Sequence, residues 1–411
     1  MSNLYFPIKT STACQLKWTW STVNLSTGKT KSCCKTDGDT VTADTFDQFH
    51  NTPGKILDRE IMLAGQWPSG GCEYCEKIEA SGGFSDRQLH QTIPHITPHE
   101  LQNNPLATTV TPRILEIYFD NLCNMSCIYC NAALSSQIYA ENLKFNIVDD
   151  SYTFLTPVEK NNITSKFWEW LQNNHHVLRR LHVLGGEPFY QPAFDRCLEF
   201  FNDNPNNNLE LNVVSNIMMK TGLFKEKISR IRTLLAKRKI ARFDLTVSID
   251  GWGPEQEYIR HGLDMDQWRE NFEYAVSQKW MTIHVNQTLT SLIMPTIPAL
   301  LSYINQQSIT RKIGHYFSTT IGTPLLELGI FGPGFFDKHF EEILRLMPAE
   351  TAENIAARDV MQGIRQQYTT SSRDSTKLRE LGQYLDSIDR RRNLNWRHTF
   401  PWLEKELNNV V

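Results

Sequence analysis

Short apolar runs alternate with helical patterns from about residue 112 to about residue 320, and this alternation restricts the fold more than any other feature. In one helical pattern, Phe194, Cys197, Leu198 and Phe201 lie three and four positions apart. Strands that alternate with helices form parallel sheets with right-handed crossovers. We therefore expect an α/β fold, either an open sheet or a partial (β/α)6 barrel of TIM type. Strands are expected at 114–119, 181–184, 209–214, 243–249, 282–288 and 313–318.

The segments on either side of this region have a different character. Residues 1–105 hold five of the nine cysteines and several turn signals, and they predict an irregular module. Four prolines between 91 and 112 indicate an extended linker. Apolar spacing after about 335 predicts a helical extension, either a cap on the barrel or ordinary packing. The expected parts are 1–105, 106–320 and 321–411.

Composition excludes several classes of protein. The 411 residues are 40% hydrophobic and 11% aromatic, which a disordered chain would not be. No apolar run reaches the length of a membrane span, and the first residues lack the pattern of a signal peptide. The net charge of −3 argues against a nucleic-acid partner. We expect a cytoplasmic protein without membrane association, in which clustered cysteines bind metal rather than form disulfides.

Three cysteines follow the first strand of this region, at Cys123, Cys127 and Cys130. Three thiolates from one loop can hold three irons of a [4Fe–4S] cluster and leave the fourth iron open. A zinc site would need a fourth ligand near by, and none stands at the usual spacing. The remaining alternative is three cysteines that serve only packing.

This motif resembles that of the radical S-adenosylmethionine (SAM) superfamily, in which Cys-x3-Cys-x-aromatic-Cys follows the first strand of a partial barrel. Cys123, Cys127, Tyr129 and Cys130 match it in type, spacing and placement. The resemblance implies that the open iron binds SAM, with Tyr129 near the adenine. Reductive cleavage would then release a 5′-deoxyadenosyl radical, which takes a hydrogen atom from the substrate.

Further motifs of the superfamily follow in order. The turn at Gly185, Gly186 and Glu187 resembles the element that holds the SAM amino group, although such a turn alone is weak evidence. The resemblance also assigns SAM contacts to polar residues at later strand ends, where Ile217 replaces the usual glycine. These residues are Ser215, Asn216, Ser248, Asp250 and Arg260. Arg260 could equally be a surface residue. Asn286 and Gln287 either point into the barrel or are half-exposed polar residues.

A second set of cysteines suits a closed site. Four thiolates with no open position fit either structural zinc or an electron-carrying [4Fe–4S] cluster. The set is Cys14, Cys33, Cys72 and Cys75. It resembles the auxiliary-cluster modules called SPASM and twitch, including a group in which the module precedes the barrel. That group shares Cys33-Cys34, then Cys72 and Cys75, then Glu79, Gly82, Ser85 and Arg87. The glycine spacing favours Cys33 over Cys34 as the ligand, and Cys197 is expected in the core.

Together these features predict a radical SAM enzyme of oxidoreductase type, with two [4Fe–4S] clusters and SAM as cofactors. The resemblance implies that the closed cluster transfers electrons, which favours oxidative modification of a peptide or protein. A small molecule or nucleotide is the alternative substrate. An electron donor such as flavodoxin or ferredoxin is the expected partner. From another class, a zinc-stabilised binding protein without activity remains open, as does a scaffold that binds SAM without chemistry.

Overall fold

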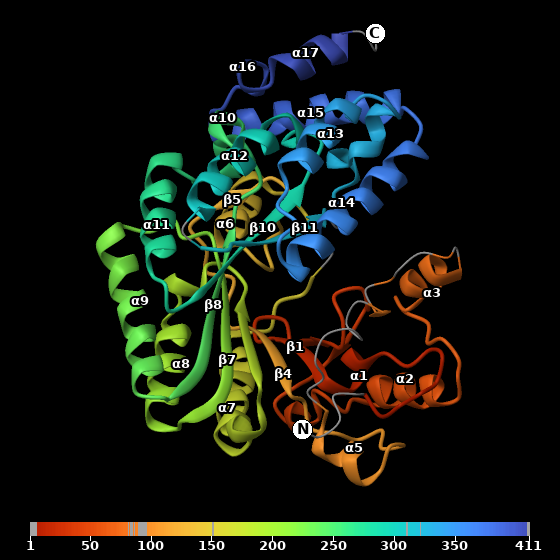
Figure 1. Cartoon of the computed structure of the whole chain (residues 1–411), viewed down its shortest axis with the longest axis vertical. Coiled ribbons are helices and arrows are strands. Elements are labelled where there is room, and N and C mark those ends of the chain that lie inside the picture. Colours follow the sequence, from red (N-terminus) through yellow and green to blue (C-terminus); the bar gives the residue numbers. More distant parts are fainter. Residues whose placement is uncertain are drawn as a thin grey trace. The chain divides into compact units, whose positions relative to one another are not determined.

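The computed structural model describes residues 6–408 except 81, 83, 84, 86, 89–96, 150, 151, 310 and 321 (Figure 1). The middle of the predicted linker, including Pro94, lies outside the described residues. The chain divides into two compact units. The first comprises Met1–Asn121, Asp149–Val213 and Arg230–Phe243, and the second Leu122–Val148, Val214–Ser229 and Asp244–Val411. The boundaries predicted from the sequence, 1–105, 106–320 and 321–411, stay a prediction.

The first unit is built on a sheet in which β4, β6 and β7 are parallel neighbours. Strand β1 joins the other edge of β4 in parallel, and β2 and β3 continue the sheet with antiparallel pairs. The strands are β1 (Trp20–Asn24), β2 (Lys29–Lys31), β3 (Asp39–Thr40), β4 (Ile114–Tyr118), β6 (Arg180–Leu184) and β7 (Asn206–Ser215, which ends in the second unit). The N-terminal segment therefore extends the parallel sheet.

Helices of the first unit begin at clear sequence signals. Helix α7 starts with a capping box, in which Thr156 and Glu159 bond each other's backbone, and Pro157 occupies the first turn. Phe194, Cys197 and Phe201 form the fully buried face that their spacing predicts on α8. The helices are α1 (Gln15–Thr19), α2 (Pro53–Leu63), α3 (Glu73–Ala80), α5 (His99–Asn103), α7 (Pro157–Asn174) and α8 (Pro192–Asp203).

The second unit contains parallel strands β8, β10 and β11. Their bounds are β8 (Ile240–Ser248, which starts in the first unit), β10 (Thr282–Leu289) and β11 (Gly314–Thr319). A short antiparallel bridge pairs β5 (Ser126–Cys127) with β9 (Arg260–His261). The helices near them are α6 (Ser136–Phe145), α9 (Thr221–Ala236, shared by both units), α10 (Gly253–Ile259), α11 (Met265–Ser277) and α12 (Ile297–Ser308). All six expected strands are confirmed, and the α/β prediction with them.

The C-terminal helices belong to the core of the second unit. Phe340, Leu381 and Leu385 are fully buried in one cluster with Ile293 and Leu301. Figure 1 draws these helices in blue. They are α13 (Asp337–Leu346), α14 (Ala352–Thr369), α15 (Ser375–Arg392), α16 (Trp396–Thr399) and α17 (Pro401–Asn408). This burial favours the packing role over a cap. Within the described residues, no helix is long and apolar enough to cross a membrane.

Candidate functional site: two cysteine clusters

The three-cysteine motif forms a compact loop in the second unit. Cys127 is buried, and Cys123 and Cys130 are half-buried. Burial, followed by the charges of Cys127 and Cys123, raises the pKa of Cys130 to about 12, so the three thiols interact. Among the described residues, no three His, Cys, Asp or Glu side chains converge on a single-ion site. A [4Fe–4S] cluster places each thiolate on a different iron, so its donors stand apart around it.

The backbone of this loop is held from two directions. Cys127 pairs with Arg260 in the β5–β9 bridge, and the amide of Ile128 donates to the carbonyl of Ile259 at 2.9 Å. Helix α15 contributes the second support, which the sequence did not indicate. The hydroxyl of Tyr384 donates to the Ile128 carbonyl, and Arg392 donates to the Ser126 carbonyl at 2.7 Å. The loop that carries the thiols is therefore fixed.

Asp250 is the centre of a buried polar network behind the loop. Its carboxylate accepts both Arg260 Nε and Nη2 at 2.9 Å and the Tyr129 hydroxyl at 2.6 Å. The Thr288 amide donates to it at 2.8 Å. Asp250 is fully buried, and the Arg260 guanidinium lies 5.5 Å from the centre of the Tyr129 ring. Tyr129, Asp250 and Arg260, which the sequence resemblance assigned to SAM, thus bind one another in the structure.

Burial and the charge of Asp250 act in opposite directions on the pKa of Arg260 and in the same direction on the pKa of Tyr129. Burial would lower the pKa of Arg260, but the charge of Asp250 raises it well above its ordinary value. Burial raises the pKa of the Tyr129 hydroxyl well above its ordinary value. Arg260 therefore stays charged and Tyr129 stays a hydrogen-bond donor. Gln287 is also fully buried and donates to the Asp250 carbonyl at 3.1 Å. These contacts fix the position of the loop through Tyr129.

The turn after β7 is strained and touches the same loop. Ile217 has φ of +51°, in the left-handed region that favours glycine. The Ser215 hydroxyl accepts its amide at 2.9 Å, and Asn271 binds its carbonyl at 2.7 Å. Asn216 then donates to the side chain of Asn124, between the first two cysteines, at 2.9 Å. Ile217 thus adopts a conformation that glycine favours, and the Ser215 hydroxyl accepts its amide.

The glycine-rich turn lies in the first unit. Gly185 has φ of +83°, and a Cβ there would come within 2.7 Å of the Tyr118 ring, so only glycine fits. Gly186 has φ of +54°. The Glu187 carboxylate is buried and accepts the amide of Phe189 at 3.1 Å. The turn therefore has the close backbone approach and the buried carboxylate that the resemblance requires. Their assignment to SAM stays a prediction, as does that of Ser248.

A row of polar residues that the sequence reading missed crosses the sheet of the first unit. The strand register places Thr22, Glu116, His182 and Asn212 next to one another on successive strands. His182 Nδ1 lies 3.2 Å from Asn212 Oδ1, and the Tyr118 hydroxyl donates to Glu116 at 3.0 Å. Alternate positions on β4, Leu115 and Ile117, are fully buried. The sequence does carry a signal for this row, because polar residues at alternate positions of a strand lie on one face of the sheet.

The pKa of Glu116 makes the burial of this row testable. Burial, together with the nearby Cys34, raises the pKa of Glu116 to about 7. The folded state therefore binds a proton that the unfolded state has released, and stability falls as the pH rises from about 4.5 to about 7. We expect Glu116→Gln to raise the free energy of unfolding by about 2 kcal/mol at pH 8 and to change it little at pH 4.5. Urea denaturation at both pH values measures this.

The matched control is Glu169→Gln. Glu169 is 59% exposed and pairs with Lys166 one helical turn away. Its replacement is expected to change the free energy of unfolding by less than about 0.5 kcal/mol at either pH. An equal effect of Glu116→Gln at both pH values would contradict the buried, protonated carboxyl.

The four N-terminal cysteines lie together in the first unit. Burial, with smaller contributions from the charges of Cys72 and Cys75, raises the pKa of Cys14 to about 11. Cys33 in turn interacts with Cys14 and Cys75. The Lys35 amide donates to Cys33 Sγ at 3.5 Å, the kind of bond that thiolate ligands of clusters accept. Cys14, Cys72 and Cys33 pack in or against one buried cluster, but among the described residues no three such side chains converge on a single ion. Thiolates that bind the separate irons of a [4Fe–4S] cluster do not need to converge in this way.

Other residues of the N-terminal motif form one buried network. The Ser85 hydroxyl donates to Glu79 at 2.5 Å, and Arg87 donates to the same carboxylate oxygen at 2.9 Å. Arg87 also donates to the carbonyl of Ala13 at 2.9 Å, directly before Cys14. Gly82, with φ of +78°, turns the chain between them. The motif spacing thus has a physical cause, because these residues fix the backbone next to Cys14.

The two adjacent cysteines are hydrogen-bonded to each other but differ in their other neighbours. The bond with Cys34 lowers the pKa of Cys33, which also interacts with Cys14 and Cys75. Exposed Cys34 influences Glu116 and Tyr118. We expect Cys33→Ala to remove the metal of the N-terminal site, about four irons per chain for a [4Fe–4S] cluster. Cys34→Ala is the matched control and should retain all metal. Iron and sulfide analysis of both variants measures this, and the reverse result would make Cys34 the ligand.

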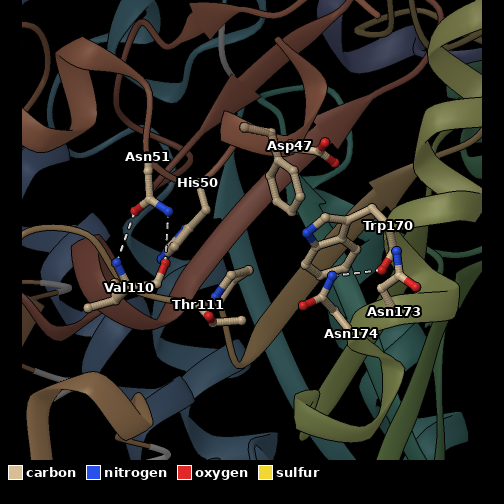
Figure 2. A pocket seen from close by; sticks show the side chains of 10 residues that line it. Asp47, His50, Asn51, Val110, Thr111, Trp170, Asn173 and Asn174 are labelled. Carbon is tan, nitrogen blue, oxygen red and sulfur yellow. Dashed lines mark hydrogen bonds between the residues drawn. The ribbon is translucent and has the colours of Figure 1, made fainter. Parts of the chain in front are cut away.

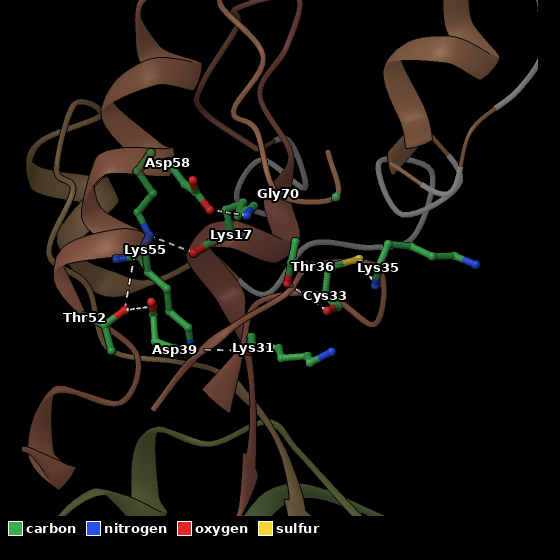
Figure 3. A network of polar contacts seen from close by, with 12 residues as sticks. Lys17, Lys31, Cys33, Lys35, Thr36, Asp39, Thr52, Lys55, Asp58 and Gly70 are labelled. Carbon is green, nitrogen blue, oxygen red and sulfur yellow. Dashed lines mark hydrogen bonds and ion pairs between the residues drawn. The ribbon is translucent and has the colours of Figure 1, made fainter. Parts of the chain in front are cut away.

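Two cavities lie in the first unit. One of about 330 Å³ is lined by His50, Asn51, Trp170 and their neighbours, and in Figure 2 Asn51 bonds both backbone groups of Val110. The other, of about 160 Å³, is lined by Lys17, Thr36, Lys55 and Asp58 among others. Figure 3 shows this polar group together with Cys33. The smaller cavity thus lies among residues that surround the N-terminal cysteines.

Comparisons with known proteins give a limited likeness. No family model and no curated protein matches the sequence. Streptococcus suis SuiB bound to the precursor peptide SuiA aligns with 82% of this chain and 64% of its own, at 13% identity and a TM-score of 0.36. Native anSMEcpe with bound AdoMet and the Kp18Cys peptide aligns with 61% of this chain and 62% of its own, at 15% identity and a TM-score of 0.35. This chain therefore spans less than two thirds of either protein. Its own residues resemble the radical SAM superfamily in the cysteine motif after β4 and in the succession of parallel strands joined by helices.

Proposed function

We propose that this chain is a radical SAM enzyme with two iron–sulfur clusters that oxidatively modifies a peptide or protein. The observation that carries the proposal is the fixed loop of three interacting thiols, tied through Tyr129 to the buried Asp250–Arg260 pair. Held by three thiolates, a [4Fe–4S] cluster supplies an open iron for SAM and the electron for its reductive cleavage. Cys123, Cys127 and Cys130 are the proposed ligands.

The remaining roles rest on the chain's own residues. Cys14, Cys33, Cys72 and Cys75 are the proposed ligands of the auxiliary cluster. Tyr129 closes over the Asp250–Arg260 pair and positions the loop, and Glu187 is the proposed acceptor for the SAM amino group. Resemblance to the SPASM and twitch modules favours a peptide substrate, and flavodoxin or ferredoxin is the proposed electron donor. A small molecule or nucleotide as substrate is the alternative.

Anaerobic reconstitution tests the proposal. Iron and sulfide are counted per chain, then dithionite and SAM are added and 5′-deoxyadenosine is measured. About eight irons together with 5′-deoxyadenosine are expected for two clusters. About four irons with zinc would retain the radical chemistry but remove the electron-transfer role of the N-terminal site. Absence of iron would instead support a zinc-stabilised binding protein.

A further inference from the structure

We propose that Lys17 is a built-in counter-charge that raises the reduction potential of the N-terminal cluster, and that Asp58 moderates its effect. This inference rests on the proposed function, because it requires iron at the four-cysteine site. It adds a role for two residues that belong to neither cysteine motif.

Helix α1 places Lys17 beside the site. Cys14 is the N-cap of this helix, and its carbonyl accepts the amide of Lys17 at 3.0 Å. The Lys17 side chain is only 2% exposed, and its Nζ forms an ion pair with the Asp58 carboxylate, whose side chain is 25% exposed. Figure 3 shows this pair joined by a dashed line. A buried ammonium therefore lies one helical turn from the first predicted ligand.

The ammonium also lies near a second predicted ligand. Its charge opposes the rise that burial causes in the pKa of Cys72. The ion pair with Asp58 keeps Lys17 charged. The N-cap of its helix is Cys14, which packs in one buried cluster with Cys72.

The two neighbouring lysines do not replace it. Lys55 is buried, and its Nζ donates to the hydroxyls of Ser21 and Thr30 at 2.9 and 2.6 Å, and to carbonyl oxygens. Lys35 is only partly buried, with its Nζ 4.4 Å from the centre of the Tyr74 ring, so solvent screens its charge more than that of Lys17. Lys17 is the cation that the structure brings against Cys72.

The effect follows from electrostatics. A reduced cluster carries one more negative charge than an oxidised one, so a nearby buried cation stabilises the reduced form more. Removal of the cation should therefore lower the potential. Removal of the Asp58 charge should raise it, because the ammonium then acts unopposed.

The test uses the full chain with Cys130→Ala, which leaves the N-terminal cluster as the one expected source of the EPR signal. In this background Lys17→Met, Asp58→Asn and the control Lys35→Met are poised at a series of potentials. At a fixed potential we expect Lys17→Met to lower the ratio of reduced to oxidised cluster about tenfold, a shift of about 59 mV for one electron. Asp58→Asn should raise the ratio, and Lys35→Met should leave it unchanged.

Each outcome decides the proposal. Unchanged potentials in Lys17→Met with full iron, or an equal shift in Lys35→Met, would overturn it. If Lys17→Met binds no iron, the Asp58→Asn variant tests the proposal instead. A reduction potential that is unchanged or lower in Asp58→Asn would contradict the moderating role of this carboxylate. Zinc in the unaltered N-terminal site would overturn the inference while leaving 5′-deoxyadenosine formation intact. Absence of iron from both sites is a failure of the proposed function itself.

Discussion

Cys130→Ala is expected to remove about four of about eight irons per chain and to abolish the formation of 5′-deoxyadenosine. Alanine removes one of three thiolates, and no replacement is available, because each of the two remaining cysteines of the motif holds its own iron. The N-terminal cysteines are unaffected and should retain their metal. Iron and sulfide analysis and chromatography of the nucleoside product measure the two effects.

Cys197→Ala is the matched control for this substitution. Cys197 is fully buried on the apolar face of α8, and burial raises the pKa of its thiol to about 12. Its replacement should retain all iron and all activity at a modest loss of stability. If Cys130→Ala kept full iron and still produced 5′-deoxyadenosine, the three-cysteine site would not be the radical-forming centre.

Asp250→Asn is expected to lower the free energy of unfolding by about 3–5 kcal/mol. The substitution leaves the Arg260 guanidinium buried without its counter-charge, since Asp250 is fully buried and the Arg260 side chain is only 8% exposed. Tyr129 and the amide of Thr288 also lose a carboxylate acceptor. Urea denaturation measures the loss. Iron bound at the cysteine loop should fall in parallel, because Tyr129 is held by this carboxylate.

The control is an exposed pair of the same chemistry. Asp266 and Arg269 lie 3.3 Å apart with side chains 92% and 45% exposed. Asp266→Asn should change the free energy of unfolding by less than about 0.5 kcal/mol. A change below about 1 kcal/mol in Asp250→Asn would show that the buried pair does not support the loop, and would favour a direct role of Asp250 toward SAM.

The sequence predicts the scaffold well because its signals are local. Each of the six strands occurs at its expected apolar run, and the face of α8 is buried as its spacing requires. The cysteines are also local, since Cys123, Cys127 and Cys130 lie in one loop. Of the four N-terminal cysteines, Cys14, Cys33 and Cys72 pack in or against one buried cluster, and the role of all four as ligands stays a prediction.

The partners of the site residues could not be predicted in the same way. A carboxylate at a strand end and an arginine ten residues later can face a ligand or each other. Helix α10 lies between these two residues in the chain, and its path determines which alternative occurs. In the structure Arg260 forms an ion pair with Asp250. Tyr384 and Arg392 support the cysteine loop from more than 250 positions away in the chain. No periodicity in the sequence connects positions so far apart.

The pairing of β1 with β4 affects how the chain can be divided. β4 has partners on both sides, and one of them is supplied by residues Trp20–Asn24. Deleting the N-terminal segment would leave a long row of unpaired amide and carbonyl groups along β4, a template for aggregation. A shortened chain that precipitates would therefore report on edge protection and not on the auxiliary cysteines. Their contribution is separable only by point substitutions that keep this strand in place.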